Sequence, residues 1–204
     1  MSTAPAPGNG TTDNNQLRAD GLAPIGFGAY LTTSDFAVDV AENWQSEYLQ
    51  FLLYIFATIW LVQKGSPESK ELDQGGLESD ADQLVGEHSN AKSPAWARVS
   101  GWRRTVFSNS LGMTMGLIFV LSWLVQSISG NSAFNEEQLR NFQHPLGWTE
   151  YVASPDFWNR TFQNWQSEFL AVGSMVVLSI YLRQRGSPES KPVGSAHDDT
   201  GTTG

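Results

Sequence analysis

The sequence predicts an all-α fold, a membrane helical bundle with three transmembrane helices. Apolar residues gather in three blocks without proline, at about 44–63, 105–128 and 165–183. Each block is long enough to cross a hydrocarbon core of roughly 30 Å as an α-helix. Tryptophans stand near the block ends, as in the aromatic belt of membrane proteins. The rest of the chain has too few amphipathic helices to cover these blocks, which disfavours the alternative of buried helices in a soluble core.

The segments outside the blocks are polar. Residues 1–23 and 192–204 are rich in Gly, Thr, Ser, Asn and Asp, which bury too little apolar surface to offset the entropy of ordering them. We therefore expect two disordered tails. Residues 71–95 are predicted to form a flexible acidic linker, so the spans belong to residues 24–70 and 96–191.

The first and third blocks belong to a repeated unit, because residues 24–70 align with residues 145–191 without a gap. Of the 47 aligned positions, 20 are identical, which indicates an internal duplication. Both copies cross in the same direction, so the repeats are parallel in orientation. The helix at 105–128 precedes the second copy, whereas the first copy lacks such a leading helix. We expect a natural start upstream of Met1, the alternative being that the first helix was lost.

The segments NEEQLR, SPDF, NWQSEF and QRGSPESK resemble an uncharacterised bacterial integral-membrane family, catalogued only as a domain of unknown function. The resemblance covers about residues 14–191, and the paired NWQSE and GSPESK motifs are specific to it. Members of that family usually carry an apolar helix before the first repeat, which this chain lacks. The resemblance implies the membrane architecture and brings no activity with it.

Lys and Arg residues predict the orientation, because cytoplasmic loops of membrane proteins carry an excess of them. Nine lie in the 64–104 linker and the C-terminal tail, whereas the opposite side holds Arg18, Arg140 and Arg160. The linker and the C-terminus are therefore expected in the cytoplasm, with the N-terminus and the 129–164 loop outside. The predicted location is the inner (plasma) membrane, crossed several times.

Both copies contain start and stop signals for a long helix. Ser154, followed by a proline and an acid, suits an N-cap, and Thr33 matches it in the first copy. Gly65 and Gly186 suit the position after a helix end, where a positive φ is easily adopted, and a proline follows two residues later. GSPESK is therefore predicted to stop the helix, and its second interpretation is a docking epitope.

Glu47 and Glu168 are candidate site residues, because a carboxylate one turn inside a span is costly unless it faces protein, water or headgroups. Gln50, Tyr54 and Thr58 extend a polar stripe from Glu47, and the matching positions after Glu168 are less polar. One hypothesis is an ion or proton site where the two copies meet. The other, which we favour, is an interfacial acid that pairs with headgroups, glutamines or a neighbouring helix.

Two further sets of residues are candidates for packing and for the membrane boundary. Ser108, Gly112 and Gly116 are small residues at a spacing of four, which allows close helix approach within the chain or, alternatively, a dimer face. The repeated motif supplies the boundary candidates Asn43, Trp44, Gln45, Ser46, Asn164, Trp165, Gln166 and Ser167.

The composition excludes or disfavours several function classes. The absence of cysteine excludes thiol chemistry, and the three histidines lack metal-ligand spacing, so no metal or cofactor is predicted. A net charge of -9 disfavours nucleic-acid binding, and no catalytic motif occurs. We expect a nonenzymatic protein of the lipid bilayer that assembles with itself or with a membrane partner protein. The alternative is a small ion- or proton-coupled transporter or channel that uses Glu47 and Glu168.

Overall fold

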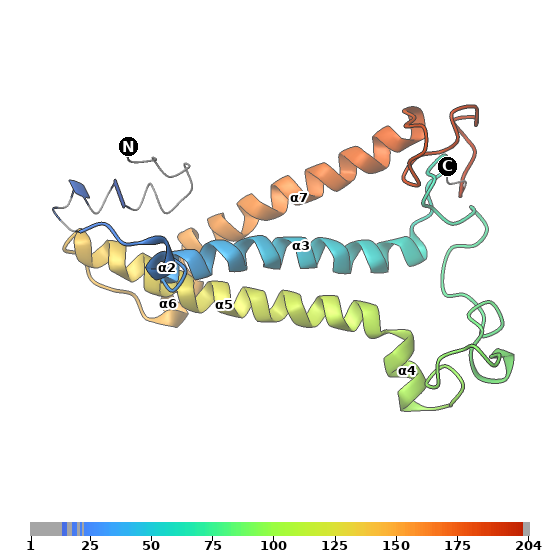
Figure 1. The fold of residues 1–204 in the computed structure, drawn as a ribbon, viewed down its shortest axis with the longest axis horizontal. Helices are drawn as coiled ribbons and strands as arrows, with labels where there is room; N and C mark the ends of the chain where they lie inside the picture. The colour runs from blue at the N-terminus through green and yellow to red at the C-terminus, as the bar shows by residue number, and fades with distance from the viewer. Residues whose placement is uncertain (1–13, 16–17, 20, 22, 202–204) are drawn as a thin grey trace. The chain divides into compact units, whose positions relative to one another are not determined.

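The protein was analysed as a computed structural model that describes residues 14–15, 18–19, 21 and 23–201. Most of the tail predicted at 1–23 lies outside these residues. The described residues form six α-helices, one short 3-10 helix and no strand, which confirms the all-α class. Figure 1 shows α2 (Phe27–Tyr30), α3 (Ser34–Trp60), η1 (Gly86–His88), α4 (Trp102–Ser108), α5 (Ser110–Arg140), α6 (Trp148–Val152) and α7 (Pro155–Tyr181).

The chain divides into two compact units. The first unit comprises residues 1–43 and 121–161, and the second comprises residues 44–120 and 162–204. The boundaries fall inside α3, α5 and α7, so each of these helices contributes residues to both units.

Among the described residues, α5 is the one helix that is both long and apolar enough to cross a membrane. Its most apolar stretch has a mean hydropathy of 1.8, and 22% of that stretch is buried. The helices α3 and α7 fall short because the polar NWQSE residues lie within them. They also end at Trp60 and Tyr181, before the last apolar residues of the predicted spans at 44–63 and 165–183.

The helices α3 and α7 begin where the sequence predicts. The hydroxyl of Thr33 accepts a hydrogen bond from the backbone N–H of Phe36 at 3.2 Å, and the hydroxyl of Ser154 accepts one from Phe157 at 3.4 Å. These bonds satisfy N–H groups that have no partner within the helix. An aspartate in each first turn further suits the positive end of the helix dipole.

The predicted span at 105–128 is wrong as one continuous helix, because Asn109 separates α4 from α5. Figure 1 shows the two helices running in different directions at this point. The side chains of Asn109 and Ser110 donate to the carbonyl oxygens of Thr105 and Phe107, at 2.8 and 2.7 Å. Such local bonds compete with regular helix geometry, which accounts for the break.

The core of the first unit forms around Tyr151 in α6 and Phe157 in α7, each 1% exposed. Their rings meet edge to face with centroids 5.7 Å apart, and Trp123 of α5 stacks on Phe157 at 6.1 Å. Burial, with the nearby charge of an aspartate, raises the pKa of Tyr151 to about 12. Gly130 lies beneath the ring of Tyr151, where a larger side chain would collide with it.

Asn14 and Asn135 form matching hydrogen bonds with the segments that precede the short helices α2 and α6 of the first unit. The side-chain amide of Asn14 bonds the backbone N–H and the carbonyl of Ile25, at 2.8 and 3.0 Å. Asn135 bonds the corresponding groups of Leu146, at 2.8 and 2.9 Å. The two pairs stand 121 positions apart, which is the offset of the sequence repeat.

Candidate functional site

A side-chain hydrogen bond joins the two NWQSE segments, residues 43–47 in α3 and 164–168 in α7, within the second unit. The indole N–H of Trp165 donates to Oε1 of Gln45 at 2.8 Å. Gln45 is fully buried, and its Nε2 has no partner among the described residues. Because a buried amide is costly unless it is bonded, this contact favours one register of α3 against α7.

The equivalent contact between Trp44 and Gln166 is not made within the chain. Trp44 is 51% exposed and lies against Tyr48 of its own helix, with ring centroids 6.0 Å apart. Gln166 is exposed, and no described residue bonds its side chain. Ser46 is buried whereas Ser167 is exposed. The glutamine and serine of one sequence motif therefore face protein in α3 and face outward in α7.

Asn43 and Asn164 each take part in a hydrogen bond within their own helix. Asn43 donates to the carbonyl of Asp39 at 3.0 Å, and the carbonyl of Asn164 accepts from the hydroxyl of Ser167 at 2.9 Å. Glu47 is exposed and Glu168 is half-buried. The structure does not bring these two carboxylates together, and neither forms a hydrogen bond or ion pair with a described residue.

Gln50 lines a cavity of about 220 Å³ in the second unit. Residues of α3 and α7 form most of its wall, with Tyr54 on one side and Met175 and Ser179 on the other. The polar stripe that begins at Glu47 therefore continues along this cavity, although Glu47 itself does not line it.

The GSPESK turns, residues 65–70 and 186–191, are built by the same bonds. The hydroxyl of Ser69 accepts from the backbone N–H of Gln63 at 2.8 Å, and that of Ser190 accepts from Gln184 at 2.9 Å. The first glycine of each turn has a positive φ, 85° and 81°, as the sequence predicts. Glycine adopts this region without the steric cost that other residues carry.

The lysine at the end of each turn forms hydrogen bonds with the segment that follows it. Lys70 donates to the carbonyl of Gly76 at 3.0 Å and pairs with Glu78 at 2.9 Å. Lys191 is 1% exposed and donates to the carbonyls of residues 196, 197 and 199, at 3.2, 2.8 and 3.1 Å. Residues 196–199 are thereby held against the second turn.

Each GSPESK turn brings an exposed glutamate, Glu68 or Glu189, to the wall of the same cavity. The phenol of Tyr54 donates to Glu68. All three residues line the cavity that contains Gln50. Sequence reasoning selected Glu47 and Glu168 and missed this pair. The available signal was the recurrence of one acid in the turn that follows each helix, at the same place in the repeat.

The sequence matches a family model described as Domain of unknown function (DUF6766) over residues 8–202. The chain belongs to this family. The match includes both NWQSE segments and both GSPESK turns, so the resemblance to a domain of unknown function is confirmed. No curated protein and no solved structure matches the chain.

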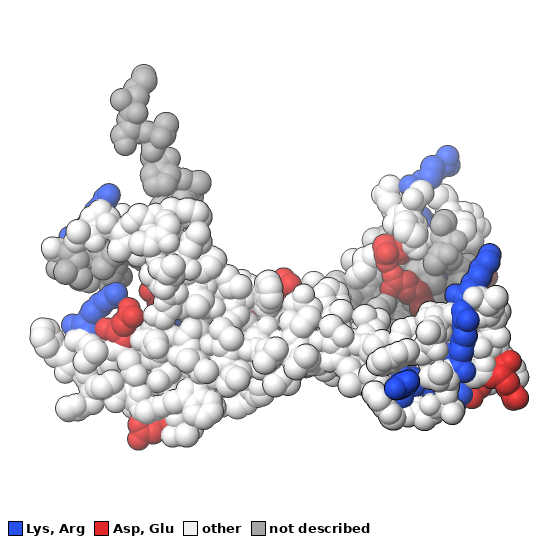
Figure 2. All heavy atoms as spheres, turned by 60° about the horizontal axis from the view of Figure 1, so that its bottom comes forward, with Lys and Arg blue, Asp and Glu red and all other residues white. Residues whose placement is uncertain are grey.

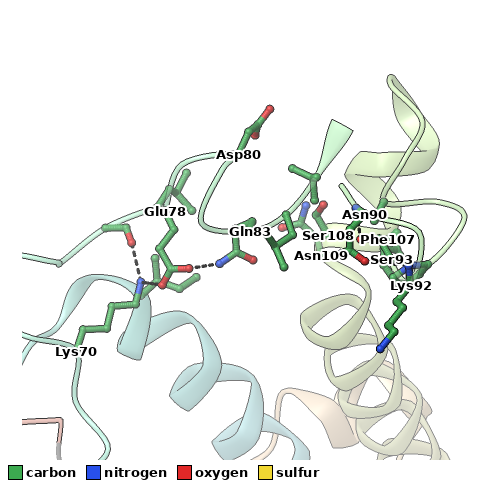
Figure 3. Close-up of a pocket in the computed structure, with 17 residues that line it drawn as sticks. Lys70, Glu78, Asp80, Gln83, Asn90, Lys92, Ser93, Phe107, Ser108 and Asn109 are labelled. Carbon is green, nitrogen blue, oxygen red and sulfur yellow. Dashed lines mark hydrogen bonds and ion pairs between the residues drawn. The ribbon is translucent and has the colours of Figure 1, made fainter. Parts of the chain in front are cut away.

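A larger cavity, of about 900 Å³, lies in the linker of this DUF6766 chain. Figure 3 shows Lys70, Glu78 and Gln83 linked in a row along its wall. Hydrogen bonds from Lys70 and Gln83, with the lysine charge, lower the pKa of the Glu78 carboxyl. Asp80, which also lines the cavity, pairs with Arg104 at 3.3 Å. Both acids of this wall are thus already paired with cations of the same chain.

The small residues of α5 lie against α3 in the second unit. A Cβ built on Gly112 would lie 3.0 Å from the ring of Phe56, and one built on Gly116 would lie 3.7 Å from Leu52. Ser108 is separated from both glycines by the break at Asn109, and it lines the linker cavity. Among the described residues, no group of three or more metal-ligating side chains is placed to hold an ion.

Proposed function

We propose that this DUF6766 member is a noncatalytic integral membrane protein that assembles with a second copy of itself through its NWQSE segments. One observation carries the proposal. Trp165 bonds Gln45 within the chain, whereas the equivalent positions Trp44 and Gln166 both face outward.

Exposed apolar side chains support the membrane placement. Large apolar residues are exposed along all three long helices, including Phe51 and Phe56 in α3, Leu117 and Leu121 in α5, and Leu178 in α7. Figure 2 shows a face on which uncharged residues predominate and charged residues gather in separate groups. Water does not solvate so much apolar surface favourably, whereas lipid chains do.

We further propose that α3, α5 and α7 each cross the bilayer. In this arrangement the polar NWQSE residues lie at headgroup depth, where tryptophan is favoured and a carboxylate is tolerated. The shorter apolar stretches of α3 and α7 follow from that depth. The bonds that recur 121 positions apart support a duplicated unit, with both copies crossing in the same direction. The linker and C-terminus are proposed to be cytoplasmic, and the segment between α5 and α7 to lie outside.

Single-cysteine labelling tests this topology cleanly, because the chain contains no cysteine. Ser79→Cys reports on the linker, and Gln143→Cys reports on the segment between α5 and α7; both positions are exposed. A membrane-impermeant maleimide should label Gln143→Cys in intact cells and Ser79→Cys only after permeabilisation. The reverse pattern would refute the orientation. Release of the wild-type protein from membranes by alkaline carbonate would refute the membrane placement itself.

The two repeats carry equivalent surfaces, one pair of which is still exposed. Within one chain, the tryptophan of the second repeat bonds the glutamine of the first. The first repeat still presents Trp44, and the second repeat still presents Gln166. A second copy that places its own Trp44 against Gln166 would repeat the contact already made inside the chain. When both chains make this contact with each other at once, the same two surfaces are used in each chain and the assembly is a closed symmetric dimer.

Cross-linking tests this interface directly. Trp44→Cys and Gln166→Cys chains carrying different tags are co-expressed and treated in membranes with a bis-maleimide. A disulfide is too short for this purpose, because a Trp–Gln hydrogen bond holds two backbones farther apart than a disulfide spans. We expect a cross-linked product that carries both tags.

Controls separate the interface from chance collisions. The double variant Gln45→Cys/Trp165→Cys should cross-link within one chain, because those side chains are bonded in the structure. Ser79→Cys mixed with Gln166→Cys should give no product carrying both tags. In native mass spectrometry the wild type should be dimeric, and Gln166→Ala should weaken dimerisation by about tenfold, the effect of losing on the order of 1.4 kcal/mol. A monomeric wild type, or failure of the mixed pair while the internal control links, would refute the proposal.

A further inference from the structure

The segment that leads into α4 and α5, residues 92–104, combines cations with exposed aromatic rings. Its cations are Lys92, Arg98, Arg103 and Arg104. Residues 88–135 contain neither Asp nor Glu, so no acid close in the sequence balances this charge. Trp96 and Trp102 of the same segment are both exposed. This basic aromatic segment therefore presents a surface suited to an anionic partner that also accepts indole rings.

The two tryptophans form one exposed aromatic surface. Trp96 lies in a turn and Trp102 at the start of α4, and their rings meet edge to face with centroids 6.0 Å apart. The guanidinium of Arg103 lies 5.6 Å from the ring centroid of Trp102, which places a cation beside the pair. Val99, between the two tryptophans in the sequence, is also exposed. Indole rings are favoured at the headgroup region of a bilayer, where an apolar ring body and a polar N–H both find suitable surroundings.

Two of the four cations are not engaged with acids or carbonyls of the described chain. Arg104 pairs with Asp80 at 3.3 Å, and Arg98 donates to the backbone carbonyls of residues 91 and 93 at 2.6 and 2.8 Å. The side chains of Lys92 and Arg103 form no hydrogen bond or ion pair with a described residue. Figure 3 shows Lys92 directed away from the acids of the linker cavity. Both charges are therefore available to a partner outside the chain.

Local hydrogen bonds hold the segment in this arrangement. Ala97 is buried, its backbone N–H donates to the carbonyl of Pro94 at 3.0 Å, and its own carbonyl accepts from Gly86 at 2.8 Å. The hydroxyl of Ser93, also buried, accepts from the backbone N–H of Asn90 at 3.0 Å. Because the turn is already ordered, contact with a partner requires little further ordering of the chain.

The place of the segment in the fold selects the partner. The helix α4 turns away from the line of α5 at Asn109, as Figure 1 shows. With α5 crossing the bilayer, α4 and the segment before it lie where the chain leaves the hydrocarbon core. Anionic headgroups that attract Lys and Arg are found at this depth, as are the surroundings that indole rings favour.

We propose that the basic aromatic segment is an in-plane membrane anchor that binds anionic phospholipid headgroups through Lys92 and Arg103. Trp96 and Trp102 insert among the same headgroups. The inference rests on the membrane placement proposed above. The net charge of -9 disfavours a nucleic acid as the partner, whereas an anionic bilayer meets only the local cations of the segment. The anchor then sets the depth at which α5 enters the bilayer.

The accessibility of a spin label tests the depth of the segment. The label is attached to Val99→Cys in the full chain, in nanodiscs of phosphatidylcholine with or without added phosphatidylglycerol. With phosphatidylglycerol, we expect the label to collide more often with oxygen than with a water-soluble nickel chelate, as a label at headgroup depth does. A label at Ser79→Cys, an exposed linker position outside the segment, should remain accessible to nickel in both lipids.

Removal of charge tests the lipid preference. The double variant Lys92→Gln/Arg103→Gln breaks no hydrogen bond or ion pair with a described residue. In native mass spectrometry its affinity for phosphatidylglycerol should fall by about 20-fold, because each cation near an anionic surface contributes about fivefold. Lys64→Gln/Arg185→Gln is the matched control, since it removes the same charge beyond α3 and α7 on the same proposed side. It should leave that affinity nearly unchanged.

The outcomes separate the anchor from the proposed function. A chain that resists carbonate extraction but keeps a nickel-accessible Val99→Cys label with phosphatidylglycerol would overturn the anchor and leave the membrane placement standing. Equal affinity for phosphatidylcholine and phosphatidylglycerol, or equal loss of affinity in the two double variants, would also overturn it. RNA binding that is lost in Lys92→Gln/Arg103→Gln, without a preference for phosphatidylglycerol, would instead identify a nucleic-acid surface.

Discussion

The guanidinium of Arg160 lies 3.1 Å from the carboxylate of Glu42, which stands 118 positions earlier in the chain. The same guanidinium lies 3.4 Å from Asp156, one turn earlier on its own helix. Burial acts to lower the pKa of Arg160, but the hydrogen bond and charge of Glu42 raise it above the ordinary value. Within the first unit, this ion pair fastens the start of α7 to α3.

Loss of this ion pair should destabilise the protein measurably. Arg160→Ala removes the ion pair with the carboxylate of Glu42, whose side chain is only 13% exposed. We expect the free energy of unfolding to fall by about 1–2 kcal/mol, because a charge-assisted hydrogen bond is lost and the pair is only partly screened. Denaturant unfolding in detergent, followed by circular dichroism, measures the change. Arg140→Ala is the control: its pair with Glu136 is longer, at 3.8 Å, and more exposed, so a loss of equal size there would contradict the argument.

Two glycines should respond oppositely to the same substitution. A Cβ at Gly130 would lie 2.6 Å from the phenol oxygen of Tyr151, whose buried ring has no room to move. Gly130→Ala should therefore lower the free energy of unfolding by about 1–3 kcal/mol. Gly173 lies inside α7 with nothing within 4 Å of its Cβ position, so Gly173→Ala should be neutral or stabilise by up to about 1 kcal/mol. Equal thermal stability of the two variants would contradict this packing.

Tyr151 should keep its proton in alkaline solution. Its pKa is raised to about 12, whereas an unperturbed tyrosine ionises near 10. The associated stabilisation is complete below the unfolded value and is lost as the pH rises through about 12. Absorbance titration of the wild type and of Tyr151→Phe should differ by one phenolate that appears only near pH 12. A difference already complete at pH 10 would show that the phenol is not buried.

Lys191 should control the order of the C-terminal segment. Its ammonium donates to three backbone carbonyls between residues 196 and 199. Lys191→Met keeps the length of the side chain and removes all three donors. Amide hydrogens of residues 195–200 should then exchange at least about tenfold faster in mass-spectrometric exchange experiments, since each lost bond is worth on the order of 1 kcal/mol. Arg185→Met is the control, because Arg185 is exposed and donates no hydrogen bond to the described residues of that segment. Equal exchange in the two variants would argue against the clamp.

The local features of this fold are readable from the sequence. Thr33 and Ser154 cap their helices through bonds that span three residues, and Gly65 and Gly186 adopt positive φ within their own turns. Such features depend on neighbours in the chain. The break at Asn109 also depends on local hydrogen bonds. From the sequence alone, however, a polar residue such as Asn109 is equally compatible with a continuous membrane-spanning helix.

The residues that join the two repeats could not be derived in the same way. The motif NWQSE is identical in both copies, yet Gln45 is buried and Gln166 is exposed. Identical sequences cannot reveal which copy faces the other, because that depends on the rotation of one helix against its neighbour. For the same reason the sequence favoured Glu47 and Glu168, whereas the acids that line the cavity between the repeats are Glu68 and Glu189.

The GSPESK turn contains most of the bonds that shape it. In the first copy, Ser69 accepts from Gln63 and donates to the carbonyl of Lys70, and Ser190 does the same for Gln184 and Lys191 in the second. The geometry is thus encoded within eight consecutive residues and recurs after two helices of different sequence. Residues 63–70, fused to the C-terminus of a designed helix, should therefore end that helix without further sequence changes. The segment contains the glycine, the proline and the hydrogen-bonding serine that form the turn.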